Sequence, residues 1–127
     1  MRKSAGQLAA VILEPIRYNC GCLEAREKFL AAVREIYTRE GIVLIFAEVI
    51  CGLRMSPGSA QSRFGVIPDL TTAAKAIGGG LPIALVGGKA EIIWLSGWGV
   101  STTRSGSRWW RRFVTACSGS RTWGWIT

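Results

Sequence analysis

The sequence predicts an α/β fold with a mostly parallel sheet and a crossover helix. Two short apolar runs, residues 8–13 and 42–46, are rich in β-branched side chains and have the length of strands buried on both faces. Between them, residues 23–40 carry apolar side chains at helical spacing. Strand, helix and strand within about 40 residues make a βαβ unit, which joins two parallel strands.

The helix expected at residues 23–40 has signals at both ends. Glu24 precedes Lys28 by four residues, the favourable order for a pair on a helix surface. Gly41 follows the last apolar position and predicts the end of the helix. The apolar stripe between these ends consists of Phe29, Leu30, Val33, Ile36 and Tyr37.

Further elements follow after the second strand. Residues 51–66 are interrupted by Gly, Ser and Pro and predict a loop with one helical turn. Strands are expected at residues 68–71 and 81–86, and a short helix at 89–95. Beyond Gly97 no helical or strand period is sustained, so we assign that segment no fold.

Charge is unevenly distributed along the 127 residues. The net charge is +8, and residues 97–127 contribute +5 of it from arginines, without any acidic residue. Five of the six tryptophans also lie in this Arg/Trp-rich tail. The high pI therefore belongs mainly to the tail and does not by itself indicate nucleic-acid binding. Stacking and charge in the tail leave a single-stranded nucleic-acid module open as an alternative.

The cysteines and the hydropathy of the sequence indicate the compartment expected for the protein. The chain has four cysteines and no histidine, and the Cys20/Cys22 pair has no second pair to complete a metal site. We expect no metal, free thiols and a reducing, cytoplasmic compartment. Glu48 interrupts the longest apolar run, so no membrane span is expected.

Lys75 is the candidate for chemistry. It follows a short predicted strand and precedes three glycines, and such loops let a backbone approach a ligand closely. In α/β sheets, ligands bind beyond the carboxyl ends of the strands. A deprotonated lysine there can form a Schiff base with an aldehyde. The alternative is a solvated surface lysine in an inert structural segment.

Four segments resemble, in order and spacing, the motifs of class III (fold-type I) pyridoxal-phosphate aminotransferases, most of all the glutamate-1-semialdehyde aminomutase branch. Residues 10–15 (AVILEP) resemble A-x-I-x-E-P, and residues 41–54 (GIVLIFAEVICGLR) resemble G-I-L-L-I-x-D-E-V…G-F-R. Residues 64–70 (FGVIPDL) and 71–82 (TTAAKAIGGGLP) resemble F-G-V-x-P-D-L and T-x-x-K-x-I-G-G-G-L-P. The resemblance implies that residues 1–96 are part of the large cofactor-binding domain of that fold.

The resemblance also implies the roles of individual residues. Lys75 would be the Schiff-base lysine of pyridoxal 5'-phosphate and would shuttle a proton between substrate and cofactor. Val49 would pack against the cofactor ring, and Asn19 would lie near the ring hydroxyl. The substrates would be small-molecule amino donors and acceptors, glutamate 1-semialdehyde among them. The family is homodimeric, so a homodimer is expected, with no membrane or nucleic acid as partner.

One departure from the family pattern bears directly on activity. Ala47 stands where the family has the Asp that pairs with the ring nitrogen and keeps it protonated. Glu48 is not expected to replace that Asp, because successive strand residues point to opposite faces. We therefore expect an enzyme by family whose chain as given is impaired or inactive.

The chain is also expected to be incomplete at both ends. The family places a phosphate-binding region before residue 1 and a T-x-x-G-N-P segment after residue 99, where residues 101–110 read differently. We interpret the tail, residues 97–127, as unstructured or as the product of a shifted reading frame.

Overall fold

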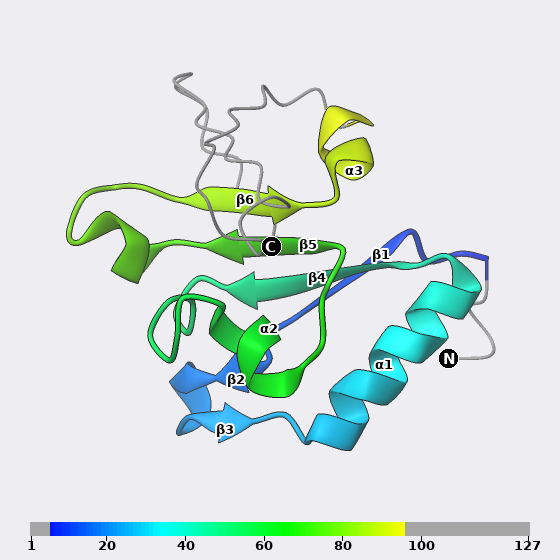
Figure 1. Cartoon of the computed structure of the whole chain (residues 1–127), viewed down its shortest axis with the longest axis horizontal. Helices are drawn as coiled ribbons and strands as arrows, with labels where there is room; N and C mark the ends of the chain where they lie inside the picture. The colour runs from blue at the N-terminus through cyan, green and yellow to red at the C-terminus, as the bar shows by residue number, and fades with distance from the viewer. Residues whose placement is uncertain (1–5, 96–127) are drawn as a thin grey trace.

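The sheet is built on three parallel strands, and helices pack against one of its faces (Figure 1). The computed structural model describes residues 6–95. Its strand order is β1-β4-β5-β6, with β6 antiparallel to β5, and β2 and β3 form a separate hairpin. The elements are β1 (Ala10–Leu13), β2 (Ile16–Arg17), β3 (Leu23–Glu24), α1 (Glu27–Glu40), β4 (Val43–Glu48), α2 (Ser59–Phe64), β5 (Leu70–Ala73), β6 (Leu85–Gly88) and α3 (Ala90–Leu95).

The core lies between α1, α2 and one face of β4. The apolar stripe of α1 buries Leu30, Val33 and Tyr37, which cluster with Leu44 and Phe46 of β4. Burial of such side chains stabilises the fold by roughly 1.5–3 kcal/mol each. The predicted crossover between parallel strands is therefore present, and α1 is the helix that makes it.

The end of α1 agrees with the sequence, but its beginning does not. Gly41 adopts the left-handed conformation (φ 69°) that ends the helix, and the Ile42 N–H bonds to the Tyr37 carbonyl at 2.9 Å. The helix starts at Glu27 rather than at residue 23. Glu24 pairs with Ile16 in the hairpin, so the expected helical pairing with Lys28 is wrong. Leu23 and Glu24 were expected to begin the helix, but their backbones pair with β2 in the hairpin instead.

Other expectations need correction in detail. The strand at residues 10–13 is not buried on both faces, because Ile12 is 55% exposed. The fourth strand begins at Leu85 rather than at residue 81, and it runs antiparallel to β5. Before it, tight turns join the Leu81 N–H to the Gly78 carbonyl and the Ile83 N–H to the Leu81 carbonyl. The helical turn expected within residues 51–66 is α2.

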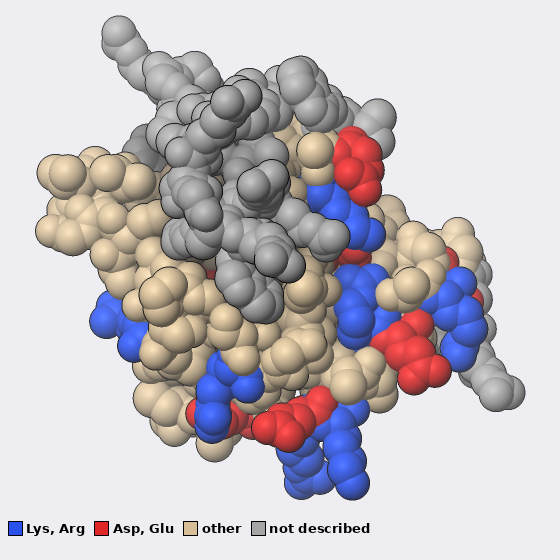
Figure 2. Space-filling view, viewed as in Figure 1, with Lys and Arg blue, Asp and Glu red and all other residues tan. Residues whose placement is uncertain are grey.

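Residues 6–95 include no helix long and apolar enough to cross a bilayer. On the face shown in Figure 2, basic and acidic side chains of the described residues are interspersed and form no separate basic patch. The Arg/Trp-rich tail, and with it the expectations for residues 97–127, lies outside the described residues.

Candidate functional site

The carboxyl ends of the three parallel strands lie at one edge of the sheet (Figure 1). Lys75 follows the end of β5, and Val49 follows the end of β4. Asn19 lies in the 3₁₀ turn of the hairpin that continues from β1. The topology thus places these three predicted residues beyond the same ends of neighbouring strands, where α/β sheets bind ligands.

Lys75 has an unusual backbone conformation and a free side chain. Its φ of 50° lies in the left-handed region, which costs a non-glycine residue on the order of 1 kcal/mol. The side chain is exposed, and no carboxylate among residues 6–95 forms an ion pair with it. Lys89, by contrast, is held by Asp69 at 2.7 Å. A strained backbone is often found at functional sites.

Ala47 lies on the sheet face opposite to α1 and α2. Along β4, Leu44, Phe46 and Glu48 are buried toward the helices, whereas the alternate residues are partly exposed. Ala47 is the register partner of Thr72 on β5. In residues 6–95 this part of the face therefore presents a methyl group and a hydroxyl, and β4 contributes no carboxylate to it.

Glu48 points to the other face and is fully buried. One of its oxygens, Oε2, accepts hydrogen bonds from the Ser59 hydroxyl and, at 2.9 Å, from the Ala60 N–H. Burial raises the pKa of Glu48, and these hydrogen bonds oppose that rise only in part. The opposite orientation of residues 47 and 48 is what the two-residue repeat predicted.

The two remaining predicted residues are near the edge but make no defining contact. Val49 is 36% exposed, and Asn19 is exposed in its turn. Among the described residues, Lys75, Val49 and Asn19 thus lie beyond the carboxyl ends of the parallel strands, but no hydrogen bond connects their side chains. A hollow of about 460 Å³ lies next to the end of β1, between the hairpin and the start of α1, and is lined by Leu13, Arg17, Leu23 and Phe29 among others.

Sequence reasoning missed two polar clusters within residues 6–95, one at each end of the parallel strands. The first is the set of groups around Glu48, described above. The second centres on Asp69, which accepts hydrogen bonds from the Leu44 N–H and Arg34, both at 2.8 Å, and pairs with Lys89. Burial opposes the ionisation of Asp69, but these donors outweigh it and lower its pKa. The Pro-Asp pair just before a strand was the available signal.

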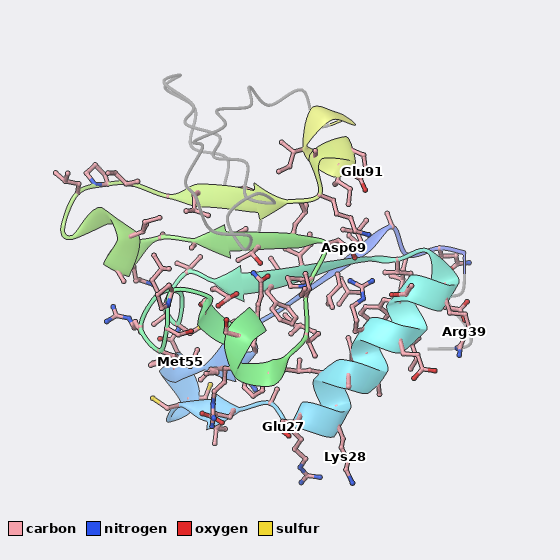
Figure 3. All side chains as sticks on the ribbon, in the orientation of Figure 1. Glu27, Lys28, Arg39, Met55, Asp69 and Glu91 are labelled. Atoms are coloured by element: carbon pink, nitrogen blue, oxygen red, sulfur yellow. The ribbon has the colours of Figure 1, made fainter. Side chains whose placement is uncertain are left out.

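Figure 3 shows Asp69 at the start of β5, at the end of the strand away from the 3₁₀ turn that holds Lys75. The Asp69 cluster ties α1, β4 and the segment before α3 together at that end. It therefore braces the sheet and does not form part of the candidate site.

The described residues offer a partner for the aldehyde of a pyridoxal-phosphate cofactor but none on β4 for its ring nitrogen. The unpaired amine of Lys75 is suited to an aldehyde carbon. The chain offers no carboxylate for a ring nitrogen at position 47, since Glu48 is committed to Ser59 and Ala60 on the far face. Among residues 6–95, the site therefore offers an exposed amine on Lys75 and no carboxylate at position 47 of β4.

Comparisons with known proteins identify the family of the chain. The model of the family described as Aminotransferase class-III matches residues 1–106. A glutamate-1-semialdehyde 2,1-aminomutase of Pelodictyon phaeoclathratiforme is 56% identical over 93 residues, which cover 73% of this chain and 22% of the relative. One from Prosthecochloris aestuarii is 53% identical over the same coverage. The chain thus spans about a fifth of the length of the curated relatives it matches.

Solved structures show the same fold. An omega-transaminase from Sphaerobacter thermophilus superposes with a TM-score of 0.69 at 47% identity, over 72% of this chain and 21% of that one. A transaminase with PLP bound gives a TM-score of 0.68 at 30% identity, over 84% and 23%. The enzymes of this family use pyridoxal 5'-phosphate. By the family match and by its fold, this chain belongs to the class III aminotransferases.

Proposed function

We propose that this chain carries the cofactor-lysine region of a pyridoxal-phosphate transaminase or aminomutase, and that Lys75 is the lysine that condenses with the cofactor aldehyde. The observation that carries the proposal is the exposed amine of Lys75 at the carboxyl edge, on a left-handed backbone and without an ion-pair partner among residues 6–95. Val49 and Asn19 would contact the ring from the neighbouring strand ends. The family membership supports the cofactor.

The residues of the chain would act in a defined order. Lys75 must first lose its ammonium proton, because only the free amine attacks a carbonyl carbon. The bound cofactor would supply an electron-withdrawing ring that stabilises negative charge on a substrate carbon. When it is not bound to the aldehyde, the Lys75 amine would accept and return a proton at a substrate carbon.

Ala47 limits the proposed chemistry. Without an acidic partner at this position, nothing on β4 keeps the ring nitrogen protonated, and charge on the substrate carbon is less well stabilised. We therefore propose that the chain captures the aldehyde and that amino-group transfer by it is impaired or absent. The substrate class proposed for the whole enzyme is glutamate 1-semialdehyde and similar amino donors and acceptors, supported by the relatives at 50–56% identity. A homodimer is proposed by family.

The test is selective covalent labelling. The purified full chain is mixed with pyridoxal phosphate and reduced with borohydride, and modified lysines are mapped by mass spectrometry. Lys75 should be modified well ahead of Lys28, an exposed lysine of α1 that serves as an internal reference. Lys75→Arg keeps the charge and should abolish the selective product. Equal modification of the two lysines would favour the inert structural alternative and refute the proposal.

A further inference from the structure

The carboxylate of Glu48 links the end of β4 to the start of α2. Its Oε2 atom accepts from the Ser59 hydroxyl and the Ala60 N–H, and the Cys51 thiol lies 3.9 Å away. Glu48 and Ser59 are both buried, and Cys51 is 1% exposed. These contacts close the loop of residues 49–58, which leaves the sheet at the candidate site and returns to it at α2.

Two residues of this connection have a strained backbone. Leu53 and Ser59 have φ values of 61° and 54°, in the region that disfavours side chains. The Leu53 N–H donates to the Ser59 hydroxyl oxygen at 3.3 Å, and that hydroxyl donates to Glu48. One hydrogen-bond chain therefore joins both left-handed residues to the buried carboxylate, and such conformations persist only when their surroundings hold them.

The same loop runs close to the strand that leads to Lys75. Gly52 donates its N–H to the Glu48 carbonyl at 2.8 Å. A Cβ added at Gly52 would lie 2.5 Å from that carbonyl oxygen and 3.3 Å from the Ala73 Cβ, so only glycine allows this approach. Ala73 is the register partner of Glu48, and it ends β5 two residues before Lys75.

The hydrogen bonds of Glu48 and the close approach of Gly52 to Ala73 lead from a buried carboxylate to the strand end two residues before the candidate lysine. We propose that Glu48, acting from the face opposite to the site, is a positioning residue for Lys75: it fixes the loop of residues 49–58 through Ser59, and the loop limits the movement of the end of β5 through the close approach of Gly52 to Ala73. This inference rests on the proposed function of Lys75. The role proposed for Glu48 differs from that of the Asp at position 47 of the family pattern, which pairs with the ring nitrogen.

The path predicts how Lys75 responds when the hydrogen-bond chain is cut or weakened. Ser59→Gly removes the hydroxyl while accepting the left-handed backbone better than serine does, so this variant is expected to fold. Glu48→Gln keeps the shape of the side chain and replaces the carboxylate with an amide, whose oxygen is a weaker acceptor for the Ser59 hydroxyl and the Ala60 N–H. In both, the end of β5 would lose its support, and Lys75 would be less well placed toward an aldehyde. A misplaced reacting group loses on the order of tenfold or more in rate.

The experiment uses the full chain, pyridoxal phosphate and borohydride, and it reads the rate of Lys75 modification relative to that of Lys28. Ser59→Gly and Glu48→Gln should lower this ratio by about tenfold, and Glu35→Gln, an exposed carboxylate of α1, should leave it unchanged. Circular dichroism verifies the fold of each variant, and Ser59→Gly decides alone if Glu48→Gln does not fold.

The outcomes separate the two proposals. No preference for Lys75 in the unsubstituted chain would refute the proposed function itself. A clear preference that persists unchanged in folded Ser59→Gly would refute only the positioning role of Glu48. A lowered ratio with an unchanged circular dichroism spectrum supports it, because a purely structural role would alter both lysines alike.

Discussion

Ala47 and Glu48 are neighbours on β4, yet their side chains lie on opposite faces of the sheet, and only Glu48 carries a carboxylate. The acidic group is buried against α2, where it binds Ser59 and Ala60. The methyl group occupies the face where the family pattern has an Asp. A carboxylate one residue away along a strand is therefore no substitute for one at the correct position.

Restoring that carboxylate should restore ring protonation. In Ala47→Asp loaded with pyridoxal phosphate, we expect the pKa of the ring nitrogen to rise by roughly 1–3 units, since a nearby opposite charge favours the protonated form. Absorption spectra recorded across a pH series measure the shift. Ala47→Asn is the matched control, because it has the same shape without the charge. Identical titrations of the two variants would contradict the assignment of position 47.

Burial of Glu48 should make stability depend on pH. The folded-state pKa of Glu48 is raised above 4.5, so the folded protein binds more protons than the unfolded chain just above that pH. Stability relative to Glu48→Gln should therefore be greatest below about pH 4.5 and should fall as pH rises through the raised pKa. Urea unfolding at several pH values measures this difference. A difference that does not vary with pH would show that Glu48 titrates normally.

The Asp69 cluster should behave in the opposite way. Asp69→Asn removes the ion pairs with Arg34 and Lys89, and we expect a loss of about 2 kcal/mol in the free energy of unfolding at neutral pH, typical of hydrogen bonds to a charged group. Because the pKa of Asp69 is lowered from 3.8, this contribution is present above that pH and is lost as pH falls through the folded-state pKa. Urea unfolding at neutral and acidic pH measures both effects.

An exposed ion pair provides the control for Asp69. Arg39 and Glu40 pair at 3.0 Å with exposed side chains, so Glu40→Gln should change the free energy of unfolding by less than about 1 kcal/mol. Equal losses in Asp69→Asn and Glu40→Gln would argue against the bracing role of the cluster.

The helix-covered face of β4 should dominate stability. Phe46 is fully buried against α1 and α2, and Phe46→Ala should cost about 3–5 kcal/mol in the free energy of unfolding. Ile12 is 55% exposed, and Ile12→Ala should cost much less. Urea denaturation of both variants tests this difference, and similar losses would mean that the two faces of the sheet are equally buried.

Local pattern was enough to predict the βαβ unit, the end of α1 at Gly41 and the opposite orientation of residues 47 and 48. Each of these depends on neighbours within a few residues, through apolar spacing, a left-handed glycine or the two-residue repeat of a strand. The motif around Lys75 likewise pointed to the family, because its residues are contiguous in the chain.

Only the tertiary structure decided the late start of α1, the antiparallel direction of β6 and the two polar clusters. Pairing of Glu24 with Ile16, and of Leu85 with Ala73, joins strands whose register no local spacing specifies. Ser59 and Ala60 meet Glu48 from eleven and twelve residues away, and Asp69 meets Arg34 across 35. Such contacts form because buried polar groups need hydrogen-bond partners. These partners are close in the folded structure but distant in the sequence, so local patterns do not reveal them.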